Sequence, residues 1–144
     1  MRFNLKSGAL ALVLFALTGA DMARADPSGV WLDKDGGTIQ VRPCGAGYCA
    51  TISSVKPALD PGTGKPWTDK HNPDARKRSR ALVGVPVLFS MKPSGPGKWS
   101  GRLYDSDSGQ MYDGHLVEVD DSTIRIEGCA LGVCGGEKLT RAPR

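Results

Sequence analysis

Apolar and polar residues alternate along most of the chain, and few segments repeat with the period of a helix. The alternation is clearest in residues 38–42 and 123–127, where isoleucine or valine occupies every second position. Short turn signals such as Asp35-Gly36-Gly37 separate the runs. The pattern therefore predicts β-strands at residues 29–32, 38–42, 48–55, 82–89, 98–104, 110–119, 123–127 and 134–141.

Eight strands joined mostly by short turns must pair with their neighbours in antiparallel fashion. We therefore expect an all-β fold, an antiparallel up-and-down eight-stranded β-barrel whose closure leaves no exposed sheet edge. Pro86, within the fourth predicted strand, indicates either an edge or a bulge. One long polar loop, residues 56–80, interrupts the series of turns, and loops of this length are usually functional or disordered.

The side chains expected to face the barrel interior are mid-sized and apolar. They suit two interiors, a cavity for one small hydrophobic ligand or a dry packed core. His115 would share an inward face with Val117 and Val119, either hydrogen-bonded inside the protein or in contact with a ligand. The whole inward set is Ile39, Val41, Ile52, Val85, Val87, Phe89, Leu103, Val117, Val119, Ile124, Ile126 and Leu139. The residues expected to line a ligand cavity are Val41, Val87, Phe89, His115, Val117 and Ile126.

The N-terminus has the composition of a secretory signal peptide. Arg2 and Lys6 precede an uncharged run over residues 8–20, and Ala23-Arg24-Ala25 matches a signal peptidase site. The run is shorter than the roughly 20 residues of a membrane-spanning helix. We expect cleavage after Ala25, a single domain over residues 26–144, no transmembrane segment and a periplasmic or secreted location. Removing three of the 19 basic and one of the 15 acidic residues leaves a net charge of only +2, so we expect no nucleic-acid partner.

Four cysteines form two pairs with C-x4-C spacing, each between two predicted strands. In an oxidising compartment such pairs form disulfides, whereas in a reducing compartment they would indicate a metal site. The export signal favours the disulfides Cys44–Cys49 and Cys129–Cys134, which would fix the register of two hairpins. A four-cysteine zinc site is the alternative.

Several motifs resemble those of the bacterial secreted family called domain of unknown function 2147. They are Gly29-Val-Trp31, Val41-Arg-Pro-Cys-Gly45, Asn72-Pro-Asp74 ahead of Arg80-Ala-Leu-Val-Gly84, Trp99-Ser-Gly101 with Tyr104-Asp105, Gly128-Cys129 and Leu139-Thr-Arg141. The resemblance covers nearly all of the predicted domain and implies a calycin-like, lipocalin-like barrel of unknown activity. It also implies that Arg141 stacks on Trp31 and plugs one end of the barrel. Leu139 departs from the family, in which an aromatic residue often stands there.

Polar residues of the 56–80 loop offer two roles. Its basic side chains, Lys65, Lys70, His71, Arg76, Lys77, Arg78 and Arg80, would suit an anionic envelope surface or a solvated loop, with Asp69 and Asp74 partly cancelling the charge. Asn72, Asp74 and Arg80 match the family pattern and predict a polar clasp that pins the loop to the barrel.

The sequence supplies no pattern of catalytic residues. It has neither G-x-S-x-G nor H-E-x-x-H, and disulfides would leave no thiol as nucleophile. The carboxylates of Asp105, Asp107 and Asp113 lie near one turn, but a glycine stands where a calcium loop needs an oxygen ligand, so a hairpin is favoured. We therefore expect no enzyme, cofactor or metal, and a binding module for a small apolar or amphipathic molecule. The alternative is a structural or protein-interaction module of the envelope that uses the 56–80 loop.

Overall fold

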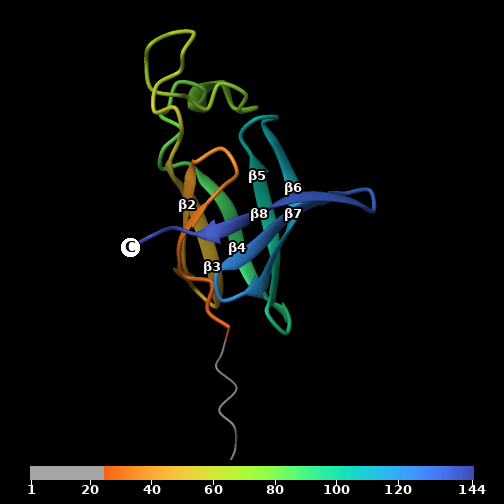
Figure 1. The fold of residues 1–144 in the computed structure, drawn as a ribbon. Coiled ribbons are helices and arrows are strands. Elements are labelled where there is room, and N and C mark those ends of the chain that lie inside the picture. Colours follow the sequence, from red (N-terminus) through yellow and green to blue (C-terminus); the bar gives the residue numbers. More distant parts are fainter. Residues whose placement is uncertain (1–24) are drawn as a thin grey trace, which may run out of the picture.

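The computed structural model describes residues 25–144, which form a closed barrel of eight antiparallel strands (Figure 1). The strands follow one another around the barrel in sequence order: β1 (Gly29–Leu32), β2 (Thr38–Cys44), β3 (Gly47–Ser54), β4 (Pro86–Gly95), β5 (Lys98–Asp105), β6 (Gln110–Asp120), β7 (Thr123–Ala130) and β8 (Val133–Arg141). β1 pairs with β8 and closes the sheet. This topology confirms the predicted up-and-down barrel.

The predicted signal peptide lies almost wholly outside the described residues. Within residues 25–144, the long loop between β3 and β4 carries a short 3-10 helix, η1 (Ala75–Lys77). No helix of the described part is long and apolar enough to cross a bilayer.

The start of β4 corrects the sequence prediction, which began this strand at residue 82. Residues 82–85 belong instead to the end of the loop, where Leu82 N–H donates to the Trp67 carbonyl and Gly84 N–H to that of Ile52. Pro86 is the first residue of β4 and lies at a register shift against β3. A strand start beside an irregularity tolerates a residue without an N–H, so Pro86 marks a bulge in a closed sheet and not an edge.

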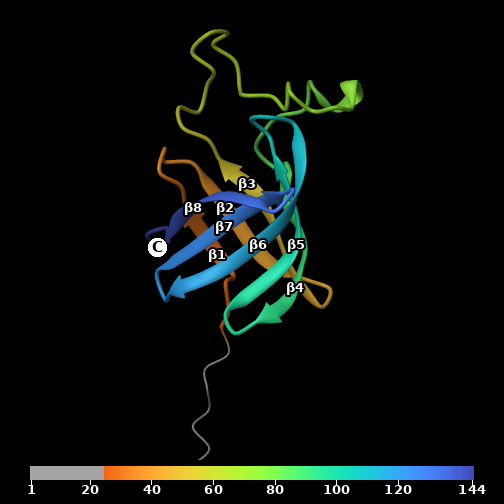
Figure 2. The same ribbon diagram turned by 90° about the vertical axis from the view of Figure 1, so that its right-hand side faces the viewer.

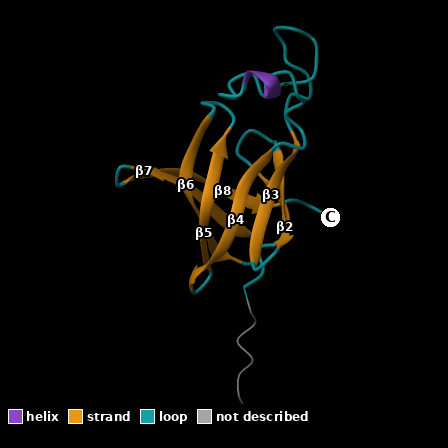
Figure 3. Ribbon diagram, turned by 180° about the vertical axis from the view of Figure 1, so that it is seen from behind, coloured by secondary structure: helices purple, strands orange, loops and turns teal. Residues whose placement is uncertain are grey.

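The two ends of the barrel differ. The plugged end, as we call it, has the tight turns at residues 45–46, 96–97 and 121–122. The open end has the turns at residues 33–37, 106–109 and 131–132, together with the long 55–85 loop. Figures 2 and 3 show this loop projecting beyond the open end.

A tryptophan and an arginine close the plugged end. The Trp31 side chain is fully buried, and its indole N–H donates to the Pro27 carbonyl at 2.8 Å. The Arg141 guanidinium lies 4.2 Å from the indole centroid, within the range of cation–π attraction, and donates to the Ser28 carbonyl at 3.0 Å. A Cβ at Gly29 would lie 2.8 Å from the guanidinium, so the first residue of the Gly-x-Trp motif must be small.

The hydrophobic core packs on this plug. Its buried members are Trp31, Val41, Ala50, Leu88, Met91, Trp99, Leu116, Ile124 and Leu139. Strand alternation places them: in β7, for example, Ile124 is fully buried while Arg125 is exposed. These large side chains fill the barrel from the plug inward.

Both cysteine pairs are joined as disulfides, one at each end of the barrel. Cys129 and Cys134 lie directly opposite each other in the β7–β8 register. Cys44 lies opposite Gly47, so its bond to Cys49 runs diagonally across the β2–β3 hairpin. All four cysteines are thereby used, and none is free among the described residues.

Candidate functional site: a cavity at the open end

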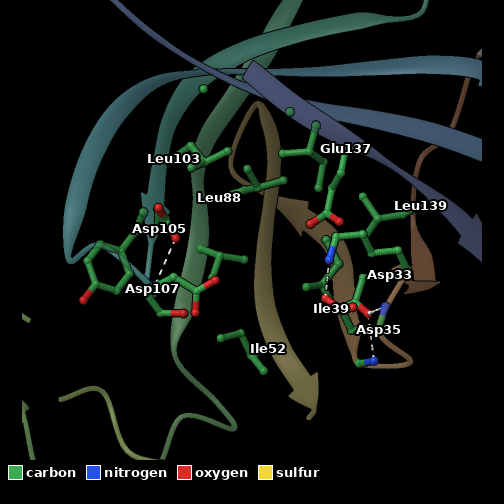
Figure 4. A pocket seen from close by; sticks show the side chains of 18 of the residues that line it. Asp33, Asp35, Ile39, Ile52, Leu88, Leu103, Asp105, Asp107, Glu137 and Leu139 are labelled. Atoms are coloured by element: carbon green, nitrogen blue, oxygen red, sulfur yellow. Dashed lines mark hydrogen bonds and ion pairs between the residues drawn. The ribbon is translucent and has the colours of Figure 1, made fainter. Parts of the chain in front are cut away.

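A cavity of about 830 Å³ opens at the end of the barrel opposite the plug (Figure 4). Its inner wall is apolar and is formed by Ile39, Ile52, Val87, Leu88, Leu103, Ile126 and Leu139. Leu88 and Leu139 also belong to the core, so the packed core forms the floor of the cavity. The volume falls within the roughly 300–1,000 Å³ typical of pockets for small molecules.

A glycine on β8 keeps the interior open at this end. Gly128 and Gly135 lie directly opposite each other in β7 and β8, and both line the cavity. A Cβ at Gly135 would have no atom within 4 Å, so this position faces unfilled space. The interior is therefore divided, with a packed half at the plug and an empty half at the mouth.

The mouth of the cavity is acidic. Its charged lining residues are Asp33, Asp35, Asp105, Asp107 and Glu137, with two lysines, Lys34 and Lys56. Lys34 Nζ is paired with the Asp35 carboxylate at 2.6 Å. The Asp33 carboxylate accepts the N–H groups of Asp35 and Gly37 and so holds the β1–β2 turn.

Glu137 extends from β8 into the same space. It lies two residues before Leu139, so both share the inward strand face, and its register partner is the cavity residue Ile126. Figure 4 shows its carboxylate directed towards the space between Leu88 and Asp33. Although Glu137 is exposed at the mouth, its partial burial together with the negative charge of Asp33 raises its pKa. No hydrogen bond or ion pair of this carboxylate is found among the described residues.

Two of the six predicted cavity residues, Val87 and Ile126, line the cavity. Val41 is buried in the core and does not. Val41 lies two residues further along β2 than Ile39, closer to the plug, whereas Ile39 lines the cavity wall.

Phe89, His115 and Val117 correct the prediction, because they lie on the outer face of the barrel. His115 Nδ1 lies 2.8 Å from the Ser100 hydroxyl, its register partner on β5. Val117 is two residues further along the same face, and Phe89 lies opposite the exposed Arg102.

The prediction for β6 was wrong by one residue, and the inward positions are those of Tyr112, Gly114 and Leu116. Val117 and Val119 made the outer face of β6 appear the more apolar one. In the folded barrel it is Leu116 that packs in the core, where it is fully buried. A shift of one residue moves every side chain of a strand to the other face.

A buried carboxylate holds the long loop over the open end. Asp69 is 0% exposed and accepts the hydroxyl of Tyr104 at 2.7 Å, the amide of Asn72 at 2.8 Å and the Arg80 guanidinium at 2.8 Å. Burial acts to raise the pKa of Asp69, but these donors outweigh it and hold the pKa below its usual value. Burial and the bond to Asp69 raise the pKa of Tyr104 to about 12.

Two of the three residues predicted for the clasp lie in this cluster around Asp69. Asn72 and Arg80 belong to it, whereas Asp74 caps η1 by accepting the N–H of Arg76 at 3.0 Å. Asp69 replaces Asp74 at the centre, and Tyr104 on β5 ties the clasp to the barrel wall. A second contact lies at Gly109, where a Cβ would overlap the His71 carbonyl of the loop.

The carboxylates considered for calcium do not converge. Asp105 accepts from the N–H of Asp107 and the hydroxyl of Ser108, both within its own turn. Asp113 pairs with Arg102 on the outer face at 3.1 Å. Among the described residues, no group of three or more His, Cys, Asp or Glu side chains is arranged to hold a metal ion.

A closed up-and-down barrel with a Trp–Arg plug at one end and an open cavity at the other defines a calycin-like barrel. Consistent with this, the fold is similar to a solved structure described as "Protein HP1028 from the human pathogen Helicobacter pylori belongs to the lipocalin family". The match has a TM-score of 0.68 and 16% sequence identity, and it covers 83% of this chain and 84% of that chain. At this identity the likeness shows a shared fold.

The family follows from the sequence itself. A family model described as "Uncharacterized protein conserved in bacteria (DUF2147)" matches residues 29–141, and the chain belongs to this family. The resemblance found in the motifs is thereby confirmed. No curated protein matches the sequence.

Proposed function

We propose that this protein is an exported, non-catalytic binding protein that holds one small apolar or amphipathic molecule in the barrel cavity. The observation that carries the proposal is the division of the interior into a packed half and an empty half, whose cavity of about 830 Å³ has an apolar inner wall and an acidic mouth. A barrel that served only as a scaffold would gain stability from filling that half. Glycine at the inward position 135 leaves it unfilled.

The apolar wall sets the scale of the affinity. A buried methylene contributes about 0.8 kcal/mol, so a decyl chain contributes about 8 kcal/mol before the cost of association. About 8 kcal/mol alone corresponds to a dissociation constant of roughly 1 μM, and subtracting an association cost of about 4 kcal/mol raises it to roughly 1 mM, so single-chain ligands are expected towards the millimolar end. Titrations must therefore extend over that range.

A fluorescence titration with the apolar dye N-phenyl-1-naphthylamine tests the proposal. The dye is expected to brighten with a saturable, one-site curve on the wild-type protein. Gly135→Leu, which fills open space in the cavity, should weaken binding at least tenfold. Thr140→Leu adds the same side chain to an exposed position of the same strand and should leave binding unchanged. Equal curves for all three proteins would refute a binding site in the cavity.

Export is part of the same proposal. It is supported by the composition of residues 1–25 and by the two disulfides, which persist in oxidising compartments. The mass of the protein from a periplasmic fraction of a bacterial host should correspond to a chain beginning at Asp26. A full-length mass in the cytosolic fraction would contradict it.

A second function, contact with an anionic envelope surface, is favoured by the charge of the loop. Exposed basic side chains extend along it: Lys56, Lys65, Lys70, Arg76, Lys77 and Arg78. Two of its three acids are already paired, Asp69 with Arg80 and Asp74 with Arg76. Replacing Lys70, Lys77 and Arg78 by glutamate should release the protein from envelope fractions at low salt. Unchanged association would argue against this function.

A further inference from the structure

We propose that the ligand is an amphiphile with an apolar tail and a cationic nitrogen head group, and that the Glu137 carboxylate is the contact for that head. The inference rests on the proposed function, because the tail needs the cavity. It goes further by assigning the charge of the ligand and a residue that selects it.

The charge of the lining is the first observation. Five carboxylates and two lysines line the cavity, although the chain as a whole carries a positive net charge. Lys34 is already paired with Asp35, and Asp33 and Asp105 are engaged in their own turns. The mouth therefore repels an anionic head group such as a carboxylate.

The position of Glu137 is the second, independent observation. Unlike the turn aspartates, it projects from a strand of the barrel wall, between Gly135 at the mouth and Leu139 at the floor. Its carboxylate therefore lies on the path between the mouth and the apolar floor. Burial together with the charges of Asp33, Asp35 and Asp107 raises the pKa of Glu137, opposed by Lys34. A cation here would pair with a carboxylate that lacks a partner among the described residues.

Competition between three ligands with the same tail tests the inference. Decylamine, 1-decanol and decanoate are each titrated as competitors of N-phenyl-1-naphthylamine at neutral pH, the alcohol below its solubility limit and the two charged ligands below their micelle-forming concentrations. We expect decylamine to displace the dye at a concentration at least tenfold lower than 1-decanol, and decanoate to be the weakest. In Glu137→Gln the advantage of the amine over the alcohol should fall to threefold or less, with the alcohol unchanged.

Glu127→Gln provides the matched control. Glu127 lies on the neighbouring strand, and its carboxylate pairs with Arg125 at 2.8 Å, outside the cavity lining. This variant should keep the full preference for the amine. Equal loss in both variants would show that net charge and not Glu137 selects the amine, and would overturn the assignment.

The three ligands also separate this inference from the proposed function. If none of them displaces the dye, the binding function itself fails. If 1-decanol and decylamine bind equally well to the wild-type protein, the function stands and the cationic head group is wrong. If decanoate binds best, the acidic mouth does not govern selection, and the inference is again refuted.

Discussion

The clasp on the long loop gives a prediction whose size follows from the structure. Asp69→Ala removes the acceptor for three donors, the Tyr104 hydroxyl, the Asn72 amide and the Arg80 guanidinium. Tyr104 and Asn72 are themselves buried, so each donor left without an acceptor costs about 1–3 kcal/mol. The Arg80 side chain is 36% exposed and regains water, so its share is smaller. We expect a loss of about 3–5 kcal/mol in the free energy of unfolding.

Urea unfolding followed by tryptophan fluorescence measures this loss. Asp113→Ala is the matched control, because that aspartate also pairs with an arginine but its side chain is 72% exposed. The control should lose no more than about 1 kcal/mol. Asp69→Asn should fall between the two, since its amide oxygen can still accept from Asn72 while the charge opposite Arg80 is gone. If Asp69→Ala cost no more than Asp113→Ala, the clasp would not hold the loop.

The same group sets a dependence on pH. Because the pKa of Asp69 is lowered in the folded protein, its contribution is complete above the ordinary aspartate pKa and is lost as pH falls through the lower folded value. The difference between wild type and Asp69→Ala should therefore shrink below about pH 4. A difference that stays constant down to pH 2 would contradict the charged form of the clasp.

Three further predictions concern the plug, the mouth and a hairpin. Arg141→Ala should cost about 1–2 kcal/mol of unfolding free energy through the lost contact with Trp31 and two carbonyl bonds, and urea unfolding that matches wild type would contradict the plug. Since the pKa of Glu137 is raised in the folded protein, the folded state loses stability as pH rises from the ordinary glutamate pKa through the higher folded value. Glu137→Gln should therefore be more stable than wild type at pH 7 and as stable as wild type below about pH 4. Equal melting temperatures of the two proteins at pH 7 would refute this. Replacing Cys129 and Cys134 by serine should lower the free energy of unfolding by about 2 kcal/mol, as expected for a disulfide that closes a short loop. A clearly smaller loss in urea unfolding would mean that the β7–β8 hairpin pairs equally well without the disulfide.

The barrel could be predicted from the sequence because strands and turns leave a local signal. Alternation at Ile124 and Ile126, and glycine-rich turns, locate most strands to within a few residues. Where alternation was ambiguous the prediction was wrong. On β6 a small inward residue, Gly114, and an outward Val117 reversed the apparent pattern, and only packing against β5 decides the face.

The candidate site was harder to predict, because a cavity is defined by side chains that are absent. Gly135 faces unfilled space only because the barrel places it opposite Gly128, where the side chain of Tyr112 packs closely. Asp69 was missed as the centre of the clasp, since an aspartate in a basic loop looks like any solvated residue until Tyr104 is brought against it. Glu137 did leave a signal that was overlooked: it stands two residues before Leu139 and therefore on the same strand face.

The central claim, that the empty half of the barrel binds the tail of a small molecule, can be tested most directly by NMR. Backbone and methyl resonances would be followed while 1-decanol is added to the ¹⁵N,¹³C-labelled protein. The account predicts the largest shifts at the cavity wall, at Ile39, Val87 and Ile126, with little change at Val117 on the outer face. Chemical-shift changes centred on the outer face would contradict it, as would unchanged resonances in a solution saturated with 1-decanol.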